Sequence, residues 1–291
     1  MKNIKIAVIP IAGLGTRFLP FTKVVAKEML PILNRPTLSY IVDEAIESGI
    51  EEIVFVTSDS KQQVLDYFSR NEKLEEELIK RGKEEQANLI RHILPAHIKL
   101  TVVYQKEQLG LGHAVLQAKE VVGDQTFALL LGDDVMYSDK QPVLKQMIDK
   151  SIELDASILG VQQVEWDVVH KYGVVSPSEK IDERTSKIDG VVEKPNKDVA
   201  PSNFTIMGRY ILKPEIFTFL EENNVDTATN EIQITDSIEK LSKISDVLSY
   251  EFDAIRYDMG SVEGFVKAQI EFSLRDKNLS ESIKNIIKKT N

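Results

Sequence analysis

The segment Ile4–Ile32, "IKIAVIPIAGLGTRFLPFTKVVAKEMLPI", carries the strongest indication of the fold class. Its first part, Ile4–Ile11, is apolar and rich in β-branched residues, which is typical of a strand buried on both faces of a parallel sheet. A glycine-containing loop that begins at Ala12 follows directly. Doubly wound α/β sheets bind their ligands at the carboxyl ends of the strands, so this loop is the first candidate binding site.

Strands and helices alternate through the rest of the first half of the chain. Pro36 and Gly49 stand at the start and the end of one expected helix, in the order that helices prefer. The further strands are expected at 51–58, 98–105 and 127–134, and the further helices at 61–68 and 112–122. This alternation predicts an α/β fold with a doubly wound, mostly parallel (Rossmann-like) sheet.

The second half of the chain is richer in strands. They are expected, some of them antiparallel, at 156–164, 172–177, 187–195, 203–212 and 247–260. Helices are expected at 214–222, 229–243 and 261–276. Because no Pro-, Gly- or Ser-rich linker separates the halves, residues 1–291 are expected to form one domain in which the second half extends the same, now mixed, sheet.

The composition excludes several classes of protein. A net charge of −10 argues against binding of a nucleic acid polymer, which normally requires a broad basic surface. No segment approaches the roughly 20 apolar residues of a membrane span. The chain has no cysteine, so disulfides, cysteine metal sites and thiol nucleophiles are excluded. These features predict a cytoplasmic protein with no membrane partner.

A highly charged insertion, "RNEKLEEELIKRGKEEQANLIR", occupies residues 70–91. Its pattern predicts a solvated amphipathic excursion from the sheet, with Leu74, Leu78 and Leu89 facing inward.

The glycine loop does not match the common nucleotide-binding loops. Gly13 and Gly15 begin a dinucleotide pattern, but Phe18 stands where the third glycine is needed and Pro20 prevents a long helix. An NAD-dependent dehydrogenase is therefore disfavoured, although Asp59 follows the second strand as an acidic residue. Glycine backbone together with the cations Arg17 and Lys27 instead predicts a site for a polyphosphate.

Two further stretches carry candidate chemistry. "LLLGDDV" ends a strand in Asp133 and Asp134, and a carboxylate there is well placed to hold Mg²⁺. Neighbouring side chains on an extended chain point in opposite directions, so both are not expected on one ion. "VVEKP" sets Glu193, an acceptor for sugar hydroxyls, beside Lys194, a cation for phosphate. By itself this dipeptide is a weak signal.

The loop resembles the signature of the sugar-nucleotide pyrophosphorylases, a family of nucleotidyltransferases. The resemblance continues through "GLGHAVLQA", "VVEKP", "APSNFTIMGRYIL" and "NEIQITDSI" and covers nearly the whole chain. Ala26 departs from the family, which commonly has Pro or Ser there, but Lys27 and the following residues stay in register. The sequences of these motifs are similar to those of family members that use UTP and glucose 1-phosphate and release pyrophosphate. Thymidylyl or cytidylyl transfer, and a non-catalytic nucleotide-sugar binding module, are the alternatives.

The resemblance implies a role for each matching residue. It gives residues 1–155 to the nucleotide, 156–275 to the sugar in a smaller extension, and 276–291 to a C-terminal helix. The residues expected to be catalytic are Arg17, Lys27 and Lys194. Those expected to bind the nucleotide are Ala12, Gly13, Leu14, Gly15, Gln105, Gly110 and Asp133. Those expected to bind the sugar are Gly173, Glu193, Lys194, Gly208 and Asp134.

The resemblance also implies a metal and an assembly. Asp133 and Asp258 are expected to hold Mg²⁺, whereas the local pattern at Asp258 alone favours a turn or helix-capping aspartate. A homodimer or homotetramer is expected. His113, inside a helix that begins with glycine, is predicted to pack or hydrogen-bond rather than to act as a base. The segment 229–241 is predicted to be a helix edge or an interface with structural acidic residues.

Overall fold

The computed structural model describes residues 3–223, 225–226 and 230–290. One nine-stranded sheet, in the order β5-β4-β1-β6-β11-β8-β12-β10-β9, runs through the molecule. Its strands are β1 (Ile6–Pro10), β4 (Glu52–Thr57), β5 (Lys99–Tyr104), β6 (Phe127–Leu130), β8 (Ser157–Gln163), β9 (Gly173–Lys180), β10 (Thr185–Glu193), β11 (Phe204–Leu212) and β12 (Val247–Glu251). Two short antiparallel pairs accompany it: β2 (Pro31–Ile32) with β3 (Arg35–Pro36), and β7 (Asp134–Tyr137) with β13 (Ile255–Asp258).

The first half of the chain builds the parallel part of the sheet, as expected. β1 pairs in parallel with β4 and with β6, and β4 pairs in parallel with β5. The helices of this half are α1 (Thr37–Glu47), α2 (Gln62–Phe68), α3 (Glu72–Lys80), α4 (Glu84–Arg91), α5 (Gly110–Gln117), α6 (Lys119–Val122) and α7 (Val143–Leu154). Pro36 precedes α1 and Gly49 follows its end with a φ of 93°, so that helix is bounded as the sequence predicts.

The second half extends the same sheet with mixed strands, which confirms the expected fold class. β11 is antiparallel to both β6 and β8, while β12 runs parallel to β8. The remaining helices are α8 (Ile216–Glu222), α9 (Ile234–Ser242), α10 (Val262–Arg275) and α11 (Ser280–Thr290). The described part of the expected 276–291 helix is α11, and Asn291 lies outside the described residues. No helix among the residues that the structure describes is long and apolar enough to cross a membrane.

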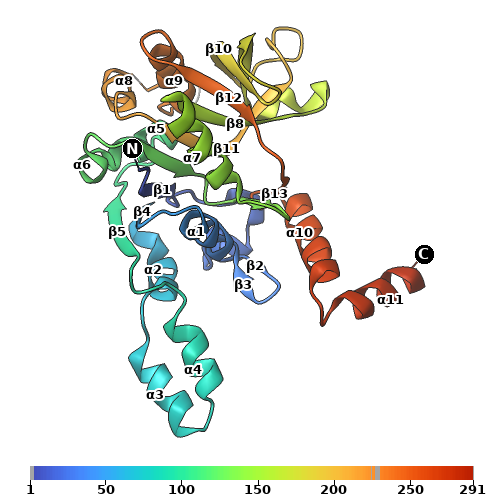
Figure 1. Cartoon of the computed structure of the whole chain (residues 1–291). Coiled ribbons are helices and arrows are strands. Elements are labelled where there is room, and N and C mark those ends of the chain that lie inside the picture. Colours follow the sequence, from blue (N-terminus) through green and yellow to red (C-terminus); the bar gives the residue numbers. More distant parts are fainter. Residues whose placement is uncertain (1–2, 224, 227–229, 291) are drawn as a thin grey trace.

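Helices cover both faces of the sheet, and each face has its own core (Figure 1). Side chains of β1 alternate between them: Ala7 and Ile9 join the core with α1, α2, α7 and α10, and Ile6 and Val8 join the core with α5, α6, α8 and α9. This alternation is the period of two that a strand imposes. It explains why β1 is apolar at every position.

The prediction for the charged insertion was wrong in its buried side chains. α3 and α4 form a hairpin that extends away from the sheet (Figure 1), with Leu74 42% and Leu89 71% exposed. The buried residues are Glu75 and Ala87, and Leu78 is half-buried. The Glu75 carboxylate accepts hydrogen bonds from Arg70 and Arg91 at 2.7 and 2.9 Å. These two arginines lower the pKa of Glu75 to about 2. An ion cluster therefore joins the two helices, and the predicted inward position fails for Leu74 and Leu89 but not for the half-buried Leu78.

The prediction for the segment 229–241 was also wrong. Its apolar side chains are buried in the core of the chain itself: Ile232, Ile234, Ile238 and Leu241. They do not form an exposed edge or an interface: Ile232 precedes α9, and α9 packs the other three against the sheet and α8. Thr229 of this segment lies outside the described residues.

Candidate functional site

Two adjoining cavities open beside the carboxyl ends of β1 and β6. One, of about 520 Å³, is lined by the glycine loop, and the other, of about 580 Å³, lies toward β9 and β10. We call them the loop cavity and the strand cavity. Four residues line both: Leu111, Leu131, Asp133 and Glu231. A ligand that occupies both cavities would therefore pass these four side chains.

The loop cavity gathers all seven residues expected to bind a nucleotide: Ala12, Gly13, Leu14, Gly15, Gln105, Gly110 and Asp133. Lys27 lines it as well, and the Thr22 hydroxyl closes the loop by donating to the Gly15 carbonyl at 2.7 Å. Phe18 packs edge-on against Phe265 of α10. The residue that breaks the dinucleotide pattern thus attaches the loop to another helix.

Gln105, which lines the loop cavity, lies next to His113. The Gln105 amide donates to the Gly110 carbonyl at 3.1 Å and lies 3.1 Å from His113 Nδ1. The other ring nitrogen of His113 lies 3.1 Å from Gln117. His113 is thus a hydrogen-bonding residue, as predicted. Sequence reasoning missed Gln108, which donates to the Ala12 carbonyl at 3.0 Å and carries no motif that would single it out.

Lys27 and Asp133 form an ion pair at the boundary between the cavities. Lys27 Nζ lies 2.6 Å from Asp133 Oδ2. Burial by itself would lower the pKa of Lys27, but the Asp133 carboxylate more than offsets it and the pKa is raised. Burial likewise opposes ionisation of Asp133, yet the charge of Lys27 and its hydrogen bond lower the pKa of that carboxyl. Both groups are therefore charged at neutral pH.

Asp258 also lies near the Lys27–Asp133 ion pair, because β13 pairs with β7. A Cβ placed on Gly260 would lie 2.9 Å from Asp133 Oδ2 and 3.1 Å from Asp258 Oδ1, so both carboxylates border one point. Arg17 reaches the same turn and donates to the Gly260 carbonyl at 3.2 Å. In the described part of the chain no group of three or more His, Cys, Asp or Glu side chains forms a metal site. Two carboxylates next to an open cavity are nevertheless the donors that Mg²⁺ prefers when phosphate oxygens and water complete its shell.

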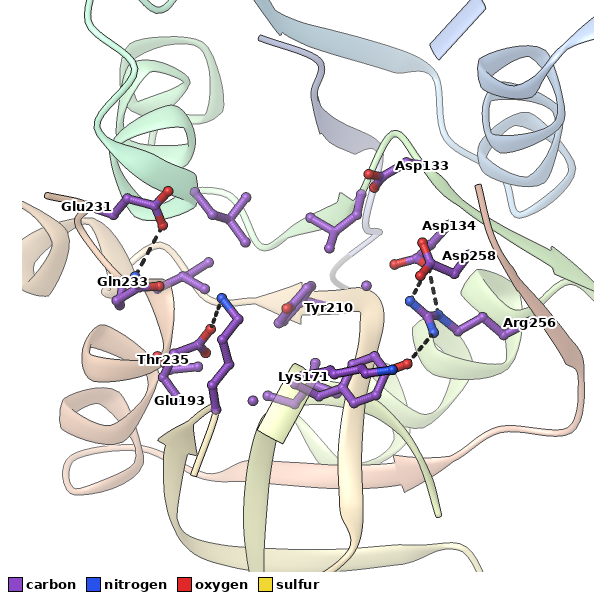
Figure 2. Close-up of a pocket in the computed structure, with 18 of the residues that line it drawn as sticks. Asp133, Asp134, Lys171, Glu193, Tyr210, Glu231, Gln233, Thr235, Arg256 and Asp258 are labelled. Atoms are coloured by element: carbon purple, nitrogen blue, oxygen red, sulfur yellow. Dashed lines mark hydrogen bonds and ion pairs between the residues drawn. The ribbon is translucent and has the colours of Figure 1, made fainter. Parts of the chain in front are cut away.

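Asp134 has a different partner from Asp133, although both line the strand cavity. Its Oδ1 accepts from Arg256 Nε and Nη2 at 2.7 and 2.6 Å (Figure 2). Burial raises the pKa of Asp134 to about 6; Arg256 opposes this shift, and the nearby carboxylates Asp133 and Asp258 add to it. Each of the adjacent aspartates therefore has its own cation.

Gly208 allows β11 to pass close to Asp134. Its φ is +66°, and a Cβ there would lie 2.4 Å from Asp134 Oδ2. The pairing of β11 with β8 is irregular at this point, between Ile206 and Tyr210. The glycine is thus both a bulge residue and part of the cavity wall.

Glu193 and Lys194 reach the strand cavity from the end of β10, where Gly173 of β9 is their neighbour. Lys194 Nζ lies 3.0 Å from Glu193 Oε1. Lys194 has a φ of 44°, outside the strand conformation, so the two adjacent side chains turn toward the same cavity. All five residues expected to bind a sugar line this cavity.

The structure adds residues that the sequence interpretation did not place in the site. Glu231 and Gln233, which precede α9, and Thr235 in its first turn line the strand cavity opposite Asp134 and Arg256 (Figure 2). Tyr172 lies beneath Arg256, with the guanidinium 5.3 Å from its ring centre. Glu231, Gln233 and Thr235 all stand in the motif "NEIQITDSI", which could have indicated them, but its acidic residues were predicted to be structural.

A glycine loop with a lysine, a pair of carboxylates and an adjoining polar cavity at the ends of parallel strands are the features that nucleotidyl transfer needs. The family model described as nucleotidyl transferase matches residues 6–273. The chain belongs to this family, as its motifs predict.

Relatives with established names agree with this membership. UTP–glucose-1-phosphate uridylyltransferase of Staphylococcus epidermidis is 46% identical over 288 residues, 99% of either chain. The solved structure named UTP-bound UGPase from Acinetobacter baumannii superposes with a TM-score of 0.90 at 38% identity, covering 98% of this chain and 99% of that one. The solved structure of a UDP-glucose pyrophosphorylase complexed with UDP-glucose superposes with a TM-score of 0.85 at 40% identity, covering 94% of this chain and 100% of that one. These names agree with the expected uridylyl transfer rather than with its thymidylyl alternative.

Proposed function

We propose that the protein transfers the uridylyl group of UTP to α-D-glucose 1-phosphate, giving UDP-glucose and pyrophosphate. The observation that carries this proposal is the Lys27–Asp133 pair at the boundary of two adjoining cavities, each lined by the residue types that one substrate needs. We assign most nucleotide contacts to residues 1–155 and most contacts with the sugar phosphate to residues 156–275, although side chains of both halves line each cavity.

The reaction needs no protein nucleophile. A phosphate oxygen of glucose 1-phosphate attacks the α-phosphorus of UTP in line, and the bond from that phosphorus to the α–β bridging oxygen breaks as pyrophosphate leaves. Catalysis is then positioning and charge neutralisation. Arg17 and Lys27 hold the departing pyrophosphate, and Lys194 neutralises the sugar phosphate. When bound at Asp133 and Asp258, Mg²⁺ would supply charge neutralisation on the phosphate oxygens.

The other lining residues recognise the substrates. Gln105 and the backbone of Ala12 and Gly13 contact the uracil, because an amide offers both a donor and an acceptor to its imide edge. Leu14, Gly15 and Gly110 complete the nucleotide wall. Glu193 and Asp134 accept hydrogen bonds from hexose hydroxyls, and the backbone at Gly173 and Gly208 lies against the hexose.

Pyrophosphate release with glucose 1-phosphate and Mg²⁺, compared across UTP, dTTP, CTP, ATP and GTP, tests the function. Fast release with UTP supports it. Release with dTTP alone would replace it by thymidylyl transfer, and release with none of the five would leave a binding module.

We further propose that the protein is a homodimer or homotetramer. α10 exposes three apolar residues at a spacing of four, Val262, Val266 and Ile270, and α11 exposes Ile286 and Ile287. α11 extends away from the rest of the molecule (Figure 1), and none of its residues Ser280–Thr290 is buried. Light scattering of the purified protein measures the assembly. Val266→Glu with Ile270→Glu is expected to give monomers if these helices form the contact.

A further inference from the structure

Glu231 lies at the boundary between the loop cavity and the strand cavity. It precedes α9, and Figure 2 shows its side chain on the wall opposite Asp134 and Asp258. Among the described residues that line the loop cavity, the carboxylates are Asp133 and Glu231. Asp133 is paired with Lys27, so Glu231 is the carboxylate that the proposed reaction has not yet used.

The backbone around Glu231 is fixed to the start of α5. Ile232 N–H donates to the Leu109 carbonyl at 2.7 Å, and Gly112 N–H donates to the Ile232 carbonyl at 2.9 Å. Gly110, with a φ of +87°, lets the chain approach so closely that a Cβ there would lie 2.6 Å from Glu231 Cβ. Gln105 donates to the carbonyl of the same Gly110. Glu231 and Gln105, the residue proposed to contact the base, are thus both held against Gly110.

The carboxylate of Glu231 is oriented by Gln233, whose Nε2 donates to Oε2 at 3.2 Å. A carboxylate has about four acceptor positions, so this bond leaves capacity for a ligand. The side chain is half-buried, which strengthens a hydrogen bond made there relative to one in bulk water.

We propose that Glu231 accepts hydrogen bonds from the ribose hydroxyls of the nucleotide and selects ribonucleoside over deoxyribonucleoside triphosphates. This inference rests on the proposed function, which places the base at Gln105 and the α-phosphate near Asp133. The ribose joins those two groups, and Gly110, Leu111 and Glu231 line the same cavity as Gln105 and Asp133. A vicinal diol carries two donors, and a carboxylate is the acceptor best suited to it.

The test compares UTP, 2′-deoxyUTP and 3′-deoxyUTP, which share one base and one triphosphate. The wild-type protein is expected to use UTP with a kcat/KM at least tenfold above that for one or both deoxynucleotides, as loss of a hydrogen bond to a charged group implies. In Glu231→Gln, kcat/KM for UTP is expected to fall toward the deoxynucleotide value, while the deoxynucleotide value itself changes little. Calorimetric binding of the three nucleotides is expected to give the same order, independently of turnover.

Glu239→Gln is the matched control, because it makes the same chemical change at an exposed position of α9. It is expected to keep the wild-type preference. Equal losses with UTP and deoxyUTP in Glu231→Gln, or an unchanged preference, would overturn the role of Glu231 while leaving uridylyl transfer intact. Wild-type protein that neither turns over nor binds UTP would overturn both proposals. Thermal melts check that each variant is folded.

Discussion

Lys27 Nζ and Asp133 Oδ2 lie 2.6 Å apart, although 106 residues separate them in sequence. The first residue belongs to the loop after β1 and the second to the turn after β6, and these strands are parallel neighbours in the sheet. Parallel pairing therefore brings a cation proposed to bind phosphate and a carboxylate proposed to bind the metal to one edge of the sheet. The charged state of each is favoured by the other.

Replacing Lys27 by alanine is expected to lower kcat by about a hundredfold or more, since a group that neutralises the leaving pyrophosphate acts mainly in the transition state. Initial rates of pyrophosphate release measure this. Lys23→Ala, an exposed lysine in the same loop, is the control and is expected to keep near-normal turnover. Near-normal turnover in Lys27→Ala would exclude it from the mechanism.

Removing divalent metal is expected to abolish turnover and to leave the fold intact, because Asp133 and Asp258 lie beside an open cavity rather than in the core. Chelation followed by titration with Mg²⁺ measures the requirement. Asp258→Asn is expected to raise the Mg²⁺ concentration for half-maximal rate about tenfold or more. Asp253→Asn, an exposed aspartate in the preceding turn, is expected to leave it unchanged. Full activity of the chelated protein would refute the two-carboxylate site.

The Arg209–Glu44 ion pair is expected to support the strand cavity from within the core. Arg209 is fully buried; it donates to Glu44 at 2.6 Å and to the carbonyls of Asp134 and Gly208 at 2.7 and 3.1 Å. Arg209→Met is expected to destabilise the protein by about 3–5 kcal/mol, because Glu44 is left as an unpaired buried charge. Urea denaturation measures the change.

The double variant Glu44→Leu with Arg209→Met separates stability from positioning. It removes both charges, so much of the lost stability is expected to return. The Asp134 carbonyl still lacks its Arg209 donor, whereas the Gly208 carbonyl keeps the Leu131 N–H at 3.0 Å. The KM for glucose 1-phosphate is therefore expected to remain raised while the KM for UTP changes little. Equal changes in both values would show that Arg209 has only a structural role.

The sequence predicted the sheet well because its strands carry their own signal. β1, β4 and β6 are apolar at nearly every position, and the loop after β1 lies where parallel sheets bind ligands. Lys27 and Asp133 could be singled out as candidates for the same reason, because each lies in a short motif that follows a recognisable strand.

The missed and mistaken features depend on contacts between distant segments. Arg256 reaches Asp134 across 122 residues, which no local period encodes. Glu75 is buried because Arg70 and Arg91 surround it, whereas a hydrophobicity pattern assigns the inward face to leucines. In the segment 229–241 the pattern identified an apolar face correctly but could not say that this chain's own core covers it.

Acid is expected to open the α3–α4 hairpin before the rest of the molecule. The pKa of Glu75 is about 2 in the folded hairpin and 4.5 for the unperturbed group, so the folded-state pKa is depressed. Its contribution to stability is therefore fully present above about pH 4.5 and is lost as the pH falls toward 2. Amide hydrogen exchange across this window is expected to accelerate in residues 72–91. In Glu75→Gln the exchange is expected to be fast already at neutral pH and to lose this step, whereas Glu76→Gln, at an exposed neighbouring position, is expected to retain it. A hairpin that keeps its protection at pH 3 would show that the Arg70–Glu75–Arg91 cluster does not hold the two helices together.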